Sequence, residues 1–182
     1  MSQPKPPREF IPLGIAVLTV SDTRGLAEDR SGDTLVGRLT EAGHRLADRA
    51  IVPDDVEEIR AKVRAWIADP AVDVVITTGG TGFTGRDVTP EALEPLFEKR
   101  MDGFSTIFHQ ISFGKIGVST VQSRATAGVA GATYIFCLPG SPGACRDAWD
   151  GILASQLDYR HLPCNFVEIM PRLDEHLRRK KS

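Results

Sequence analysis

A run rich in glycine and threonine, Thr77-Thr-Gly-Gly-Thr-Gly82, carries the strongest chemical signal in the sequence. Adjacent glycines can adopt positive φ and turn successive backbone N–H groups toward one anion, and threonine hydroxyls add further donors. A tight strand-to-helix turn without a ligand would use the same residue types. Because the glycines and threonines directly follow an apolar run, the pattern favours a phosphate-binding loop made of Thr78, Gly79, Gly80, Thr81 and Gly82.

The loop differs from two common nucleotide-binding patterns. The P-loop pattern is absent, since no lysine follows a suitable glycine. Gly80, Gly82 and Gly85 match the dinucleotide fingerprint formally, but the next helix is predicted only from residue 89, too late for the third glycine to pack a helix on its strand. No acidic residue ends a strand about 20 positions later, as that fingerprint requires. A nicotinamide cofactor is therefore disfavoured.

Three aspartates could approach such a phosphate. Asp87 follows the glycine loop, where a carboxylate is unfavourable unless a cation intervenes, and Mg²⁺ commonly binds one or two carboxylates together with phosphate oxygens. Asp87 could equally be a turn residue. Asp54, three positions before Glu57, has the spacing of a helix N-cap, and spacing alone favours that role over a ligand role. Asp22 is open between turn former and ligand contact.

The remaining polar residues narrow the class of reaction. The segment Pro139-Gly-Ser-Pro142 can end a strand and begin a helix, whose N-terminus could equally bind an anion. The four histidines are scattered, and none adjoins a glycine loop, so a Ser-His-Asp triad is poorly supported. A phosphate site with carboxylates and no covalent nucleophile indicates phosphoryl or nucleotidyl transfer, in which catalysis is mostly positioning and charge neutralisation.

The elements that must position these residues alternate between apolar runs and amphipathic segments. Strands are predicted at 13–20, 44–52, 72–78, 117–121 and 133–138, helices at 31–42, 54–67, 89–100, 104–113 and 141–157, and a short helix or loop at 125–131. Strands that are apolar throughout indicate a three-layer αβα fold, a mainly parallel sheet with helices on both faces. Ligands bind beyond the carboxyl ends of such strands, so the loops at 21–24, 78–82 and 139–142, together with Asp54, should share one rim.

Length and composition predict one domain and exclude several classes of protein. We expect a disordered lead-in at 1–10, a single α/β domain at 11–166 and a tail or short helix at 167–182. The net charge of −2 gives no reason to expect a nucleic acid, and no apolar run is long enough to predict a membrane span. An N-terminus without an apolar signal segment and three cysteines without a Cys-x-x-Cys pair predict a cytosolic protein.

Taken together, the motifs resemble the MoaB/MogA family of molybdenum cofactor biosynthesis, and bacterial MoaB in particular. The resemblance runs from about residue 11 to residue 166, and the combination is specific although no single motif is. It rests on Ser21-Asp-Thr-Arg24, Pro53-Asp54, Thr78-Gly-Gly-Thr-Gly82, Arg86-Asp-Val-Thr-Pro-Glu-Ala92, Ser123-Arg-Ala125, Pro139-Gly-Ser-Pro142 and Pro163-Cys-Asn-Phe166.

The resemblance implies a protein that binds molybdopterin and, in active members, adenylylates it with MgATP and releases pyrophosphate. Asp54 and Asp87 correspond to the two essential aspartates of the family, which would hold or orient Mg²⁺. This match reverses the preference for Asp54 as a cap. The resemblance also implies that the pocket is lined by Ser21, Asp22, Ser123, Pro139, Gly140 and Ser141.

The same resemblance leaves an alternative and implies partners. A non-catalytic molybdopterin-binding or scaffold protein of the same pathway would keep the loops and use both aspartates as cap and turn residues. Family members assemble as homotrimers or homohexamers and act with other molybdenum cofactor proteins. We additionally assign Arg86 and Arg124 as side chains that could neutralise phosphate charge.

Overall fold

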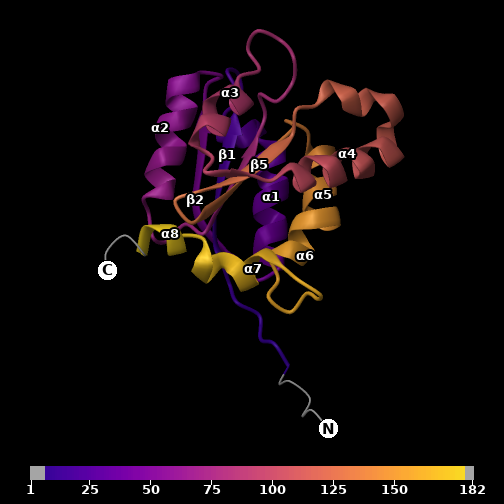
Figure 1. Ribbon diagram of the computed structural model, residues 1–182. Helices are drawn as coiled ribbons and strands as arrows, with labels where there is room; N and C mark the ends of the chain where they lie inside the picture. The colour runs from indigo at the N-terminus through magenta and orange to yellow at the C-terminus, as the bar shows by residue number, and fades with distance from the viewer. Residues whose placement is uncertain (1–6, 179–182) are drawn as a thin grey trace.

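Six strands form a single sheet in the order β2-β1-β3-β6-β5-β4 in the computed structural model, which describes residues 7–178 (Figure 1). β1, β2, β3 and β6 run parallel, whereas β5 pairs antiparallel with β6 and with β4. This confirms the mainly parallel sheet predicted from the apolar runs. The strands span Gly14–Val20 (β1), Arg45–Val52 (β2), Val74–Thr78 (β3), Lys99–Arg100 (β4), Thr126–Ala130 (β5) and Thr133–Leu138 (β6).

Helices cover both faces of the sheet, which confirms the three-layer prediction. Successive strand residues point to opposite faces, so Ile15 and Val17 of β1 pack with α1, α4 and α5, while Ala16 and Leu18 pack with α2 and α3. The helices span Arg30–Glu41 (α1), Val56–Ile67 (α2), Thr89–Leu93 (α3), Asp102–Ile116 (α4), Pro142–Ala148 (α5), Ala154–Gln156 (α6), Phe166–Ile169 (α7) and Glu175–Arg178 (α8). A π-helix, Trp149–Leu153, joins α5 to α6, and 3-10 helices span Leu26–Glu28, Glu94–Leu96, Gly117–Gln122 and Met170–Arg172.

Two of the local predictions are wrong near β5. The strand predicted at 117–121 is a 3-10 helix that continues from α4. The short helix or loop predicted at 125–131 is strand β5, because Gly131 and Ala132 both adopt positive φ and make a tight turn that pairs β5 with β6.

The helix predicted over 89–100 is also shorter than expected. α3 stops at Leu93, and a 3-10 helix that contains Pro95 follows before β4. Proline cannot donate the backbone hydrogen bond that would continue an α-helix, so the chain leaves the helical path at this residue.

Both ends of the described chain contact the domain. In the predicted lead-in, the Arg8 guanidinium donates to the Glu168 carboxylate and to the Tyr159 carbonyl, so residues 7–10 are held against the domain. Val167 of α7 is buried in the core, so the domain extends beyond the predicted boundary at residue 166. The predictions for 1–6 and 179–182 lie outside the described residues. Within residues 7–178, no helix combines the length and apolarity that crossing a bilayer requires.

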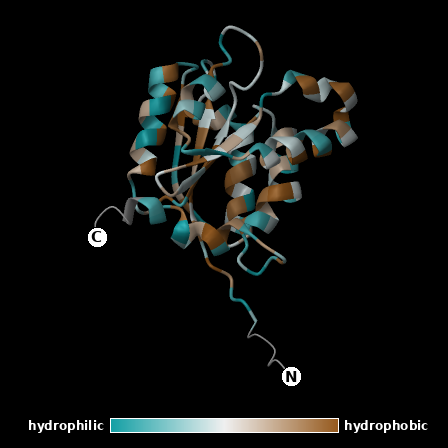
Figure 2. Cartoon of the chain, viewed as in Figure 1, coloured by the Kyte–Doolittle hydropathy of each residue, from teal (hydrophilic) through white to brown (hydrophobic). Residues whose placement is uncertain are grey.

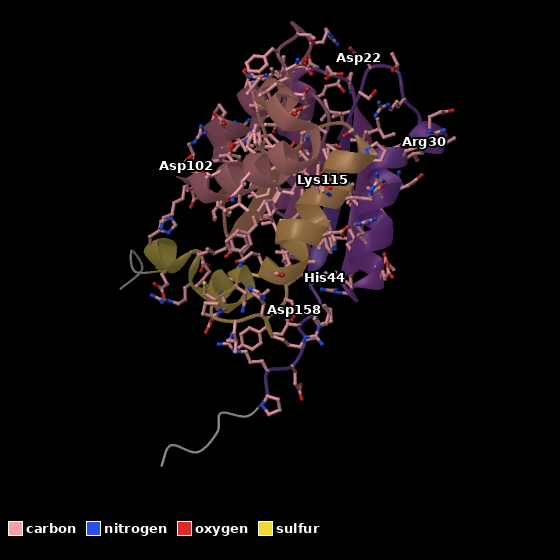
Figure 3. The ribbon with its side chains drawn as sticks, turned by 90° about the vertical axis from the view of Figure 1, so that its right-hand side faces the viewer. Asp22, Arg30, His44, Asp102, Lys115 and Asp158 are labelled. Atoms are coloured by element: carbon pink, nitrogen blue, oxygen red, sulfur yellow. The ribbon has the colours of Figure 1, made fainter. Side chains whose placement is uncertain are left out.

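His44 is a buried titratable side chain at the end of the domain opposite Asp22 (Figure 3). It packs against the rings of Phe10 and Trp149, and its Nδ1 accepts a hydrogen bond from the Leu13 amide. Burial lowers the pKa of His44 from its ordinary value of 6.5, against the attraction of Asp158.

We expect the free energy of unfolding to fall as the pH drops below the ordinary histidine pKa of about 6.5, because the unfolded chain then protonates His44 while the folded protein does not. Urea unfolding at several pH values between neutral and acidic measures this slope. His44→Gln should flatten it, whereas His161→Gln, in a loop at the same end, should largely preserve it. An unchanged slope in His44→Gln would contradict the prediction.

Candidate active site

Strand register brings the predicted loops to one edge of the sheet. Thr19 of β1 pairs with Thr78, Thr78 pairs with Leu138, and Val20 pairs with Val52, so four strands end at nearly the same level. Beyond these ends lies a cavity of about 330 Å³. Of the predicted site residues, those that line it are Ser21, Asp54, Gly79, Gly80, Thr81, Gly82, Asp87, Ser123, Pro139, Gly140 and Ser141.

The glycine loop is held in a conformation that only glycine adopts easily. Gly79 and Gly80 have φ values of 104° and 64°. The Gly79 amide donates to the Leu138 carbonyl at 3.0 Å, while the Thr89 hydroxyl and amide donate to the Gly79 and Gly80 carbonyls at 2.8 and 2.9 Å. The loop is therefore fixed between β6 and the start of α3 before any ligand arrives.

Thr78 does not line the cavity, although it was predicted as a phosphate ligand. It is buried, and its hydroxyl donates to the Pro139 carbonyl at 3.0 Å and lies 3.3 Å from the Cys145 sulfur. Its position at the last residue of β3 explains this, because the chain turns toward the cavity only at Gly79. Thr78 joins the glycine loop to the 139–142 loop.

Asp54 is not the N-cap of α2. The neighbouring Asp55 accepts hydrogen bonds from the Glu57 and Glu58 amides and fills that role. Asp54 instead exchanges hydrogen bonds with Asp22, whose amide donates to the Asp54 carboxylate while the Asp54 amide donates to the Asp22 carboxylate. Burial and then the charge of Asp22 raise the pKa of Asp54, with a smaller contribution from Asp87. An ionised Asp54 is therefore held beside other negative charge, an arrangement that a cation would relieve.

Asp22 lies outside the cavity lining and positions the residues around it. Arg86 makes a two-pronged ion pair with Asp22, with Nε and Nη2 at 2.8 and 2.7 Å from the two carboxylate oxygens. The Arg86 hydrogen bond, followed by the Asp54 amide, lowers the pKa of Asp22. Because Arg86 is already paired and does not line the cavity, the structure does not support the charge-neutralising role predicted for it.

Asp87 lines the cavity from the segment after the glycine loop. One of its oxygens, Oδ2, accepts from the Thr84 amide at 2.8 Å and from the Thr84 hydroxyl at 2.6 Å. Burial works against ionisation, but these hydrogen bonds lower the pKa of Asp87 overall. Asp87 is therefore an ionised carboxylate at neutral pH. It forms the turn with Thr84 and lines the cavity at the same time.

The 139–142 loop forms another wall. Ser141 caps α5, since its hydroxyl oxygen accepts from the Ala144 amide at 3.1 Å. A Cβ atom on Gly140 would lie 3.1 Å from the Cα of Gly79, so the two loops pass in contact. Phosphate oxygens placed in this cavity would face backbone from both loops.

Val20, Arg24 and Gln122 also line the cavity, although none of them was predicted as a site residue. Arg24 closes the Ser21-Asp-Thr-Arg24 motif, so its place next to Asp22 was a usable signal. Its guanidinium donates a long hydrogen bond of 3.4 Å to the Gly140 carbonyl. Gln122 precedes Ser123 and becomes a cavity residue only because the 3-10 helix ends there.

The donor set fits a metal ion that arrives with a phosphate ligand. Among residues 7–178, no three His, Cys, Asp or Glu side chains form a cluster that could hold a metal by themselves. Asp54 and Asp87 nevertheless line the same cavity as the glycine loop. Two carboxylates plus phosphate oxygens and waters are the ligands that Mg²⁺ commonly takes.

Comparison with known proteins agrees with this geometry. The family model described as a probable molybdopterin binding domain matches residues 16–159. The chain belongs to the MoaB/MogA family. Molybdenum cofactor biosynthesis protein B of Escherichia coli K12 is 55% identical over 158 residues, which cover 87% of this chain and 93% of that protein. The Bacillus subtilis protein of the same name is 43% identical over 142 residues, covering 78% and 84%.

Solved structures of the MoaB/MogA family have the same fold. A crystal structure of molybdenum cofactor biosynthesis protein B matches with a TM-score of 0.82 and 37% identity, covering 94% of this chain and 99% of that one. The tungsten cofactor synthesizing protein MoaB from Pyrococcus furiosus matches with a TM-score of 0.72 and 36% identity, covering 84% and 94%. The family resemblance and the fold predicted from the sequence are both confirmed.

Proposed function

We propose that this chain acts in molybdenum cofactor biosynthesis by binding molybdopterin and transferring the adenylyl group of ATP to it. An oxygen of the terminal molybdopterin phosphate attacks the α-phosphorus of ATP, and the bond to pyrophosphate breaks. The observation that carries the proposal is a single cavity in which a glycine loop of fixed conformation lies together with the carboxylates of Asp54 and Asp87.

Each part of the cavity has a role in this reaction. Backbone N–H groups of 80–82 and the Thr81 hydroxyl bind phosphate oxygens, and the start of α5 at Ser141 faces the second phosphate-bearing substrate. Asp54 and Asp87 would hold or orient a Mg²⁺ ion bound with ATP, and that ion would neutralise charge that develops on the phosphates. The protein otherwise contributes orientation of the attacking oxygen, which is the main source of rate in phosphoryl transfer.

A second candidate function is a non-catalytic molybdopterin-binding or scaffold protein of the same pathway. It is favoured by the hydrogen bonds that both aspartates make within the protein, Asp54 with Asp22 and Asp87 with Thr84. In that case the cavity would bind the pterin phosphate and ATP would have no site.

We also propose that copies of the chain assemble as homotrimers or homohexamers, the states implied by the family resemblance. The end of α4 and the following 3-10 helix project from the domain and expose apolar side chains (Figures 1 and 2). Exposed apolar side chains gathered on one projecting segment are typical of an interface between proteins. They are Phe113, Ile116, Val118 and Val121, and Ile107 is also exposed earlier in α4. A cytosolic location and contacts with other pathway proteins remain predictions. The three free cysteines are compatible with the cytosolic location.

The test is incubation of the purified protein with molybdopterin and MgATP, with detection of adenylylated molybdopterin and pyrophosphate. Addition of EDTA should stop product formation, and molybdopterin alone should still bind. Tight molybdopterin binding without any adenylylated product would favour the second candidate. Analytical ultracentrifugation of the same sample reports the assembly state.

Arg24 provides a more specific prediction for the enzyme. Because Arg24 lines the cavity and its hydrogen bond to the Gly140 carbonyl is long, Arg24→Gln should weaken a charge-assisted contact to phosphate and raise the KM for ATP about tenfold. Steady-state kinetics at low and high salt measure this change, and the difference between the proteins should shrink at high salt. If Arg24→Gln and the wild type have equal KM values for ATP at low salt, Arg24 does not contact the ATP phosphates.

A further inference from the structure

We propose that Arg124 is a positioning residue that holds Asp87 and the glycine loop in place, and that it does not neutralise substrate phosphate. This inference deepens the function proposed above, because it gives Arg124 a specific part in that site. It replaces the charge-neutralising role predicted for Arg124 from the sequence.

The Arg124 guanidinium joins three separate segments. Nε donates to the Gly82 carbonyl at 2.8 Å, Nη2 donates to the Asp87 carbonyl at 2.8 Å, and Nη1 forms an ion pair with Glu91 in the first turn of α3. The Arg124 amide adds a fourth bond, to the Thr81 carbonyl at 2.9 Å. One residue therefore ties both ends of the 82–87 loop to the helix that follows it.

The loop has little else to fix it to the protein. Residues 83–86 are exposed, and the bonds between Thr84 and Asp87 lie within the loop itself. The Arg86 pair with Asp22 is made by exposed side chains, and such pairs contribute little. An exposed segment with few external bonds opens easily. Arg124 is thus the main tie between the rest of the protein and the loop that carries Asp87.

The contacts of Arg124 also argue against a charge role. Its side chain does not line the 330 Å³ cavity but borders a separate surface hollow with Glu91. Two backbone carbonyls and one carboxylate use its Nε, Nη1 and Nη2 atoms, and Glu91 already offsets its charge. Only a planar guanidinium fork can reach both carbonyls at once, because a lysine ammonium is a single point on a flexible stem.

The experiment compares Arg124→Lys, Arg124→Gln and Glu91→Gln with the wild type. Arg100→Gln is the matched control, because Arg100 pairs with Glu94 and Asp102 without touching the loop. In the ligand-free protein, the hydrogen-bonded amides of Thr84 and Asp87 should exchange with deuterium at least about tenfold faster in both Arg124 variants and less so in Glu91→Gln. Arg100→Gln should exchange like the wild type.

The kcat values of the variants distinguish a positioning role of Arg124 from a charge-neutralising role. If Arg124 positions Asp87, Arg124→Lys should lose about 10- to 100-fold in kcat, almost as much as Arg124→Gln, because a displacement of about 1 Å has this effect. Glu91→Gln should lower kcat as well. If Arg124 acted by charge, lysine would retain activity and Glu91→Gln would bind ATP more tightly.

An Arg124→Lys protein with wild-type exchange and wild-type kcat would overturn the inference. Thermal unfolding shows whether Arg124→Gln folds. If it does not fold, Arg124→Lys and Glu91→Gln still test whether Arg124 is a positioning residue. The exchange measurement uses free protein and does not depend on any reaction. If the wild type forms no adenylylated product while loop exchange rises as expected, the proposed function fails and the positioning role of Arg124 stands.

Discussion

Asp54→Asn and Asp87→Asn should each lower adenylyl transfer at least about 100-fold while the protein remains folded. Both side chains lie at the cavity that holds the glycine loop, and each would lose the negative charge that a Mg²⁺–phosphate complex requires. Asparagine keeps an oxygen that can accept the present hydrogen bonds from the Asp22 amide and from Thr84. The loss should therefore be one of chemistry rather than of structure.

Asp54→Asn should also be slightly more stable than the wild type at neutral pH. The pKa of Asp54 is raised from 3.8, so the folded protein holds the Asp54 proton more tightly than the unfolded chain does. The ionised carboxylate therefore costs stability at neutral pH, and that cost disappears as the pH falls below the ordinary pKa. Thermal unfolding at neutral and acidic pH should show the gain only at neutral pH.

Asp55→Asn is the matched control for this pair. Asp55 is adjacent to Asp54 but caps α2, and asparagine caps a helix about as well as aspartate does. Activity and stability should both stay near wild type. If Asp54→Asn and Asp87→Asn transfer adenylyl groups as fast as Asp55→Asn, the two carboxylates have no part in the reaction. If either variant supports normal cofactor production as the sole copy in a cell, the binding-protein alternative is favoured.

Gly79→Ala should destabilise the fold by about 3–5 kcal/mol, an effect at the upper end for a single substitution. Gly79 has a φ of 104°, which alanine adopts only with strain, and an added Cβ would lie 2.3 Å from the Val20 carbonyl oxygen. That oxygen belongs to a strand of the sheet core and cannot move aside. The melting temperature should fall by about 10 °C or more.

Gly85→Ala tests whether position, rather than loss of glycine in general, causes this effect. A Cβ atom on Gly85 would have no heavy atom within 4 Å, and its φ is not positive. We expect it to change the free energy of unfolding by less than about 0.5 kcal/mol. Chemical denaturation of both variants measures the difference, and a Gly79→Ala protein as stable as Gly85→Ala would show that the loop can rearrange.

The sheet and the rim of the cavity could be predicted from the sequence because their signals are local. Apolar runs such as 13–20 and 72–78 are long enough to define buried strands, and parallel strands necessarily end at the same edge. Eleven of the residues named from the motifs consequently line one cavity. β5 was missed because its small side chains resemble those of a helix or loop, and its turn depends on Gly131 and Ala132 together.

The roles of individual charged residues could not be predicted in the same way. Asp54 and Asp55 are neighbours of the same type, and only the backbone angles at the start of α2 decide which one caps the helix. Arg124 reaches carbonyl groups about 40 positions earlier in the chain, a distance that no spacing pattern reports. Asp22 was predicted to line the pocket because of its place in the Ser21–Arg24 motif. It lies outside the cavity lining and pairs with Arg86, a distant partner that no spacing pattern reports.

The two outer strands of the sheet limit how copies of the protein can join. β4 has only two residues, both basic, and β2 carries the charged residues Arg45, Asp48 and Arg49 beside the exposed Leu46. Short or charged borders of this kind resist templating by a strand from another molecule. Side-by-side stacking into a continuous, fibril-like sheet is therefore disfavoured at both borders. We expect several copies to join through contacts between helices or loops, and such contacts leave each backbone ladder complete within its own subunit.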